Sequence, residues 1–102
     1  DVVAGSGAVW AVHGGHRLQA AVTGAGCMAT TAIGAFLALG GDPAYQAALA
    51  LGTYGLAAAR GGVGAAGPGS FRVRLIDEVA GLRRRGVRGL RVEPAHGGAP
   101  AR

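Results

Sequence analysis

The chain has 102 residues, a mass of 9.9 kDa and a net charge of +5, and 44 of its residues are alanine or glycine. The lone Cys27 excludes both a disulfide scaffold and the usual structural zinc site, which needs two or more cysteines. A mean hydropathy of +0.34 excludes disorder throughout, while the scarcity of large apolar side chains predicts a thin core.

The positive charge is confined to the last part of the chain. Residues 72–102 carry eight Arg against three acids, whereas residues 1–71 carry two Arg and two Asp and are neutral. Single-strand nucleic-acid binders interleave basic with aromatic residues, and only Phe71 lies close to this basic segment. We therefore predict no nucleic-acid partner.

The first residues, Asp1-Val2-Val3, contain neither an initiator Met nor the features of a secretory signal, so we expect a fragment of a longer protein. The 24 uncharged residues between Arg17 and Asp42 are long enough to span a membrane, which makes a membrane hairpin an alternative. Glycine and threonine residues lower the hydrophobicity of this stretch. We therefore favour a strand, a turn and a buried helix, with no membrane partner.

Three β-branched segments predict strands: Val2–Ala4, Ala8–Val12 and Arg17–Val22. Gly14-Gly15 fits a two-residue turn with positive φ at both positions, and so predicts a hairpin over residues 8–22. The histidines on either side of this turn are expected to be exposed rather than to bind a metal.

Glycine pairs and helix caps divide the following residues into helices. Thr23–Gly26 predicts a tight turn, after which Cys27–Leu39 forms a helix that is buried on most sides. Asp42 caps a second helix, with Pro43 at its first position, and this helix runs to Arg60.

A third helix follows a Gly/Ala loop at residues 61–69. Ser70 is expected to cap it, and Arg83–Arg85 lie at its C-terminal end, where the helix dipole favours positive charge. Its apolar face is formed by residues at three- and four-residue spacing: Phe71, Leu75, Val79 and Leu82. We expect residues 86–102 to be a basic, mostly disordered tail, with Val87–Val92 as a weak strand. This order of strands followed by helices predicts the end of an α/β domain.

The glycine turn before the first predicted helix is the segment that indicates chemistry. The first N–H groups of a helix have no intrahelical acceptor, and glycines let an anion approach the main chain. A helix N-terminus also favours the thiolate form of a cysteine, so Cys27 could accept a proton from an attacking hydroxyl. Two other interpretations remain open: the dinucleotide pattern G-x-G-x-x-A at residues 24–29, and a structural turn with an inert buried cysteine.

Three segments in register resemble one family of enzymes. Residues 21–27, Ala-Val-Thr-Gly-Ala-Gly-Cys, are similar to the anion-hole segment of hydroxyethylthiazole kinases, which belong to the ribokinase-like superfamily. In that superfamily most relatives carry Asp in place of Cys27. Residues 3–9 resemble the family pattern V-A-V-[ST]-G-x-V, and residues 67–77 resemble G-P-G-S-F-x-x-x-L-[LI]-D.

The resemblance implies a fold and a reaction. The fold is a three-layer α/β/α domain, of which residues 1–85 would be the C-terminal part. The reaction is ATP-dependent phosphorylation of the hydroxyl of 5-(2-hydroxyethyl)-4-methylthiazole in thiamine biosynthesis, with Mg²⁺. Another ribokinase-like kinase of a small alcohol or vitamin is the alternative within the superfamily. The resemblance further implies a cytoplasmic homo-oligomer, a trimer.

The resemblance also assigns roles to individual residues. Cys27 takes the position of the catalytic base, and the amides of Ala25, Gly26 and Cys27 form the anion hole. Gly24 matches a contact to the thiazole substrate, and Ser6 matches a contact to ATP. Trp10 departs from the family, whose members commonly have an acidic residue there. No metal ligand is assigned, because the family's acidic residues and an ATP-contacting Arg would lie upstream of residue 1.

Overall fold

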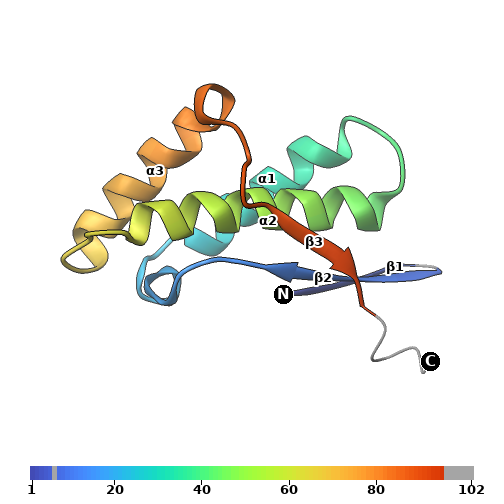
Figure 1. Ribbon diagram of the computed structural model, residues 1–102, viewed down its shortest axis with the longest axis horizontal. Helices are drawn as coiled ribbons and strands as arrows, with labels where there is room; N and C mark the ends of the chain where they lie inside the picture. Colours follow the sequence, from blue (N-terminus) through green and yellow to red (C-terminus); the bar gives the residue numbers. More distant parts are fainter. Residues whose placement is uncertain (6, 96–102) are drawn as a thin grey trace.

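A computed structural model describes residues 1–5 and 7–95. It consists of a small sheet with helices packed on one of its faces (Figure 1). Along the chain, the elements are two strands, a short 3₁₀ helix, three α-helices and a final strand: β1 (Val2–Gly5), β2 (Ala8–His13), η1 (Arg17–Ala21), α1 (Ala25–Leu37), α2 (Pro43–Gly62), α3 (Pro68–Arg85) and β3 (Arg91–Pro94). The α/β class predicted from the sequence is therefore correct.

The sheet is antiparallel, with the strand order β1-β2-β3. Its central strand pairs Trp10 with Val3 on one side and Val12 with Val92 on the other. The strands predicted at residues 2–4 and 8–12 are confirmed with slightly longer bounds. The last strand lies later than the predicted 87–92, and the expectation of a disordered tail is wrong for residues 91–94. Residues 96–102 of that expected tail lie outside the described residues.

The predicted hairpin at Gly14-Gly15 is wrong, because residues 17–21 form η1 instead of a strand. Both glycines have positive φ, as expected, but the Gly15 N–H donates to the Gly55 carbonyl of α2 at 3.0 Å. The chain therefore bends to dock on a helix rather than to return along β2. The side chain of His16 caps η1, and this cap provides a local alternative to strand pairing.

Helix α2 lies at the centre of the fold, in contact with all three strands and with α1 and α3 (Figure 1). It begins as predicted: Asp42 Oδ2 accepts a hydrogen bond from the Tyr45 N–H at 2.9 Å, and Pro43 is the first helical residue. Its buried positions are mostly Ala and Gly, and a Cβ at Gly52 would come within 2.8 Å of the Val92 Cγ2 atom. Small residues therefore let the helix approach the sheet closely.

The core is small, as the composition predicts, and Phe71 and Leu75 of α3 are its largest fully buried side chains. Leu82 packs against this core, whereas Val79, which was predicted on the same face, is 40% exposed. Ser70 is the third residue of α3 rather than its N-cap, and its hydroxyl accepts hydrogen bonds from the N–H groups of Ala66 and Gly67.

None of the helices in residues 1–5 and 7–95 combines the length and apolar character needed to cross a membrane. The expectation that the first helix is buried on most sides is wrong, because Ala25 is its only buried residue. In the described structure α1 packs against α2 and η1, and its other sides are open.

Candidate functional site

The glycine turn predicted from the sequence lies between η1 and α1. Gly24 is the N-cap of α1 and adopts a left-handed conformation, with φ of 93° and ψ of −10°. A side chain at this position would meet no atom within 4 Å, so glycine is required by the backbone conformation rather than by space. The turn therefore presents an open surface beside its main chain.

Two amides of the predicted anion hole lack a backbone acceptor, and the third has one. The Ala25 N–H donates to the Val22 carbonyl at 3.3 Å, and Ala25 is buried. Helix α1 starts two residues earlier than predicted, which places Gly26 and Cys27 in its first turn, both exposed. Within residues 1–5 and 7–95, the amides of Gly26 and Cys27 have no backbone acceptor. These two N–H groups can therefore bind an anion directly, whereas that of Ala25 would first have to release Val22.

Cys27 is a free cysteine and is the third residue of α1. Its carbonyl accepts a hydrogen bond from the Thr31 hydroxyl at 2.9 Å, and the carbonyl of Gly26 accepts one from Thr30 at 3.1 Å. These bonds lie on the helix and leave the first-turn amides free. Cys27 is exposed, so the buried position given to it in one of the alternatives left open by the sequence is wrong.

Tyr54 connects the centre of the fold to this turn, and the sequence analysis gave it no role. Its buried hydroxyl donates to the Ala25 carbonyl at 2.8 Å, which ties α2 to the first residue of α1. Burial raises the pKa of Tyr54 above the ordinary tyrosine value, so the hydroxyl remains protonated and able to donate. The sequence alone does not indicate this contact, because α2 also carries Tyr45, Gln46 and Thr53 and the partner of Tyr54 is 29 residues away.

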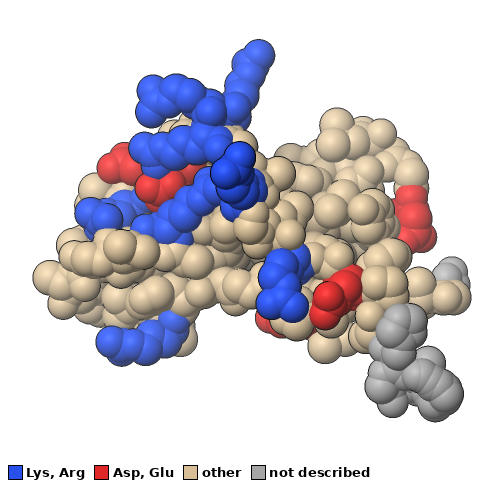
Figure 2. All heavy atoms as spheres, in the orientation of Figure 1, with Lys and Arg blue, Asp and Glu red and all other residues tan. Residues whose placement is uncertain are grey.

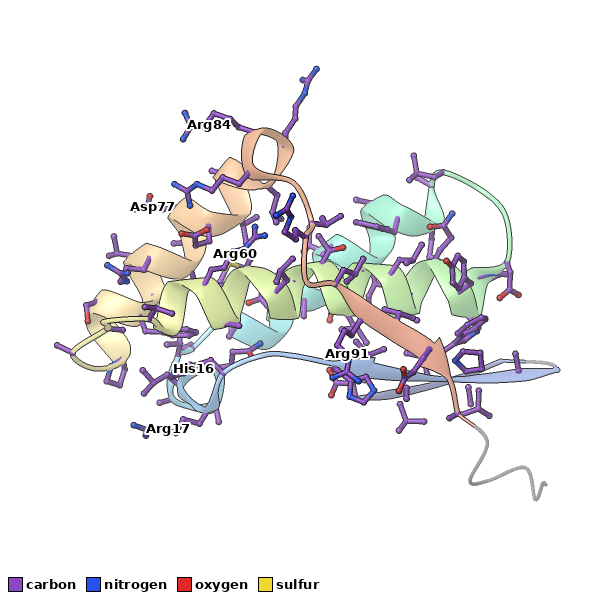
Figure 3. The ribbon with its side chains drawn as sticks, viewed as in Figure 1. His16, Arg17, Arg60, Asp77, Arg84 and Arg91 are labelled. Atoms are coloured by element: carbon purple, nitrogen blue, oxygen red, sulfur yellow. The ribbon has the colours of Figure 1, made fainter. Side chains whose placement is uncertain are left out.

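A shallow cavity of about 330 Å³ separates the turn from the start of α3. It is lined by Ala21, Val22, Thr23, Pro68, Gly69 and Arg72. Arg72 thus brings a guanidinium group to the side of the turn, which sequence reasoning did not foresee. The arginines of the chain gather over α3 and the segment that follows it (Figure 2). Arg84 lies at the C-terminal end of α3 (Figure 3), so among these arginines it is Arg72 that lines the cavity beside the turn and favours a negatively charged ligand there.

A larger cavity of about 520 Å³ lies on the other side of η1. It is lined by the 13–17 loop, by Tyr54 and Gly55 of α2, and by Ala29 of α1. Gly26 and Cys27 line neither of these two cavities, whereas Thr23 of the turn lines the smaller one. We therefore place the candidate site at the glycine turn, where the free amides and the thiol lie.

The remaining predictions from the sequence concern the contact to ATP and the ligands of Mg²⁺. Ser6, predicted to contact ATP, lies outside the described residues. Trp10 packs against Tyr45 of α2, with ring centroids 4.8 Å apart, so this departure from the family pattern serves the contact between sheet and helix. Across residues 1–5 and 7–95, no group of three or more His, Cys, Asp or Glu side chains is arranged to hold a metal ion. These residues do not fit a Mg²⁺ site, and no step below depends on one.

Comparison with known proteins identifies relatives of one kind. The model of the Hydroxyethylthiazole kinase family matches residues 1–85. A hydroxyethylthiazole kinase from Desulforudis audaxviator is 44% identical over 94 residues, which are 91% of this chain and 34% of that relative. A second, from Methanoculleus marisnigri, is 43% identical over 82 residues, which are 80% of this chain and 29% of that relative.

The structural comparison agrees with the sequence comparison. The structure of a hydroxyethylthiazole kinase protein from Pyrococcus horikoshii OT3 matches with a TM-score of 0.74 and 32% identity, covering 92% of this chain and 40% of that chain. The chain therefore spans well under half the length of these relatives. The family model covers most of the chain, and on this evidence the chain belongs to the hydroxyethylthiazole kinase family.

Proposed function

We propose that the chain is the C-terminal portion of an enzyme that phosphorylates the hydroxyl of 5-(2-hydroxyethyl)-4-methylthiazole with ATP, a reaction of thiamine biosynthesis or salvage. The observation that carries this proposal is the left-handed glycine turn with two exposed, unbonded amides at the start of α1, in a chain of this family. Such a turn binds the oxygens of a phosphoryl group, and phosphoryl transfer depends mainly on positioning and charge stabilisation.

In the proposed reaction the substrate hydroxyl oxygen attacks the γ-phosphorus of ATP, and the bond between that phosphorus and the bridging oxygen of ADP breaks. The amides of Gly26 and Cys27, together with the positive end of the α1 dipole, stabilise negative charge on the transferred group. The proton that leaves the hydroxyl passes to the Cys27 sulfur, which accepts it as the thiolate and becomes the thiol; this side chain is exposed beside the amides. Gly24 contacts the thiazole, and Ser6 contacts the nucleotide.

We also propose a metal ion, an oligomeric state and a cellular location for the complete protein. Mg²⁺ would accompany ATP, with ligands outside residues 1–5 and 7–95, because these contain no suitable cluster. We also propose a cytoplasmic homo-oligomer, a trimer, on the basis of the family resemblance. The chain spans 34% of one relative's length, so these properties belong to the complete protein rather than to this chain alone.

Substrate choice tests the proposal. The complete protein is incubated with ATP and either the thiazole alcohol or a panel of other small alcohols, including pyridine-ring and sugar alcohols. We expect ADP release and a phosphate monoester, detected by ³¹P NMR, with the highest kcat/KM for the thiazole alcohol. Turnover of another alcohol, with none for the thiazole alcohol, would overturn the assignment in favour of a different kinase of the superfamily.

A further inference from the structure

The segment that leads into the glycine turn is held by the imidazole of His16. This half-buried residue is the N-cap of η1: its Nδ1 accepts a hydrogen bond from the Leu18 N–H at 3.1 Å. In return, Gln19 Oε1 accepts one from the His16 N–H at 2.7 Å. These two hydrogen bonds, one accepted by the His16 side chain and one donated by the His16 backbone, hold the first turn of η1 in the manner of a capping box.

The same ring fills the junction between η1, α2 and α3. It stacks on Phe71 of α3, with ring centroids 5.3 Å apart and an angle of 27° between the planes. Gly62, the last residue of α2, lies directly against it, and a Cβ at Gly62 would overlap the Cδ2 and Nε2 atoms of the imidazole. Figure 3 shows His16 below the C-terminal part of α2. The position therefore combines a cap with a packing contact to two helices.

Two backbone hydrogen bonds connect η1 to the glycine turn. The Val22 N–H donates to the Gln19 carbonyl at 3.4 Å, and the Ala25 N–H donates to the Val22 carbonyl at 3.3 Å. In each of these bonds the donor follows the acceptor by three residues. The placement of η1 therefore determines where Gly24 and the free amides lie. Val22 is itself buried in the core.

We propose that His16 is a positioning residue for the phosphoryl transfer, acting through η1 on the orientation of the Gly26 and Cys27 amides. The inference rests on the proposed function. His16 does not line the cavity beside the turn, so it is not assigned a contact with substrate or nucleotide. A small displacement of catalytic groups from their productive geometry is costly even when the altered residue is remote from the chemistry.

Two substitutions distinguish the role of His16 as a hydrogen-bond acceptor in the cap from its role in stacking on Phe71. His16→Asn keeps an acceptor near the position of Nδ1 and loses the ring, whereas His16→Phe keeps a ring to stack on Phe71 and loses the acceptor. His13→Asn is the matched control, because His13 contributes to an exposed pair with Glu93 at 2.9 Å on the sheet and not to η1. All three are made in the complete protein.

We expect His16→Phe to lower kcat by about 10- to 100-fold, the cost of misplaced catalytic groups, while KM changes by no more than roughly threefold. His16→Asn should recover part of this loss, and His13→Asn should retain the kcat of the wild type. A His16→Phe enzyme that is folded and has wild-type kcat would overturn the proposal, as would an equal loss of kcat in His13→Asn.

A second measurement does not depend on activity. Hydrogen exchange of residues 17–28 and the rate of Cys27 alkylation by iodoacetamide, followed on its own peptide by mass spectrometry, report the order of the turn directly. We expect His16→Phe to speed exchange in this segment and to alter the alkylation rate, with His16→Asn intermediate and His13→Asn unchanged. Unaltered exchange and alkylation in His16→Phe would overturn the positioning role. If the wild-type protein fails to phosphorylate the thiazole alcohol, the proposed function fails, while these two readouts still decide whether His16 orders the turn.

Discussion

In the proposed reaction, Cys27 and the amides around it would make two separable contributions to catalysis. The thiol is exposed on the first turn of α1, next to N–H groups that need no side chain to act. If the Cys27 thiolate accepts the hydroxyl proton, Cys27→Ala should lower kcat by about 10²- to 10⁴-fold, the usual range for a lost general base. KM for ATP should change little, because the proposed contact to the nucleotide is at Ser6 and not at Cys27.

Steady-state kinetics of the complete enzyme measures this effect. Cys27→Ser is the control, since its hydroxyl has a similar size but gives up a proton less readily than a thiol, and we expect a loss of similar order. A Cys27→Ala enzyme within a few-fold of the wild-type kcat would leave the amides as the catalytic device and remove the thiol from the mechanism.

The left-handed backbone at Gly24 leads to a prediction about two neighbouring glycines. A Cβ atom at either Gly24 or Gly26 would meet no atom within 4 Å apart from the adjoining residues, but of the two only Gly24 has positive φ. Gly24→Val should therefore lower the free energy of unfolding by about 1–2 kcal/mol or more, since a β-branched residue tolerates this conformation poorly. Gly26→Val should be close to neutral for stability.

Urea unfolding of both variants checks this prediction. Activity alone would not, because a valine at either position also crowds the surface where we place the substrate. Equal stability of the two variants would show that the turn can relax to a right-handed conformation.

The sequence predicted the residues of the site that belong to a local motif, and it missed those brought there by tertiary contacts. Gly24 and Cys27 belong to one short motif, and the structure places them at a helix N-terminus as expected. Tyr54 and Arg72 reach the turn only through the packing of α2 and α3, and no local pattern indicates which residues a tertiary contact will bring there.

At the scale of elements, one hydrogen bond joins α2 to α1, and it has a predictable dependence on pH. The phenol of Tyr54 donates to the Ala25 carbonyl in a buried environment, and burial raises its pKa. The unfolded chain therefore loses this proton first as the pH rises. Stability contributed by the neutral phenol is complete below about pH 10 and declines above it.

Tyr54→Phe should lower the free energy of unfolding by about 0.5–1.5 kcal/mol at neutral pH, the usual net value of a hydrogen bond. It should also reduce the decline of stability in alkaline solution. Denaturant unfolding at several pH values compares it with Tyr45→Phe, the exposed tyrosine at the start of α2, which should leave the decline unchanged. An alkaline decline that Tyr45→Phe removes and Tyr54→Phe retains would contradict the assignment.

The glycines within helices differ in what surrounds them, and this difference predicts opposite effects of one substitution. A Cβ at Gly61 of α2 would lie 3.0 Å from the backbone nitrogen of Leu75 in α3, whereas a Cβ at Gly34 of α1 would meet nothing within 4 Å. Alanine favours a helix over glycine by up to about 1 kcal/mol. Gly34→Ala should therefore stabilise the protein by a similar amount.

Gly61→Ala should instead destabilise by about 1–3 kcal/mol, because two packed backbones must separate to admit the methyl group. Thermal or urea unfolding of the two variants gives the comparison. Stabilisation by both would mean that the spacing between α2 and α3 is not set by Gly61.

The elements that the sequence predicted were those with local start and stop signals. Asp42-Pro43 marked the start of α2, which the structure confirms. The 3₁₀ helix was missed because its N-cap is His16, which lies outside the usual set of N-cap residues, and because Gly14-Gly15 is equally typical of a hairpin. The last strand was misplaced because its partner, β2, is about 80 residues away, as the pairing of Val12 with Val92 shows.

At the scale of the whole molecule, many large apolar side chains remain uncovered in the described structure. Val2, Leu39 and Val63 are 71%, 76% and 70% exposed, whereas only Phe71 and Leu75 among large side chains are fully buried. The ordering of each residue costs about 1–2 kcal/mol of conformational entropy, which a core of this size offsets poorly. Relatives of this chain have about three times its length, since it spans 34% of one of them.

We therefore expect the 102-residue chain, expressed alone, to show no ATP-dependent turnover of the thiazole alcohol, whereas the complete protein is active. The chain alone lacks the partner surfaces for its exposed apolar residues, and residues 1–5 and 7–95 offer no cluster for the metal that accompanies ATP. Turnover and the dispersion of the NMR amide signals are measured on both forms at equal concentration. Adding the separately expressed remainder of the complete protein is the control, and it should restore dispersion before it restores turnover, because the exposed apolar residues of the chain must be covered before a site can form. Turnover by the chain alone would contradict this expectation and would place the whole catalytic apparatus within these 102 residues.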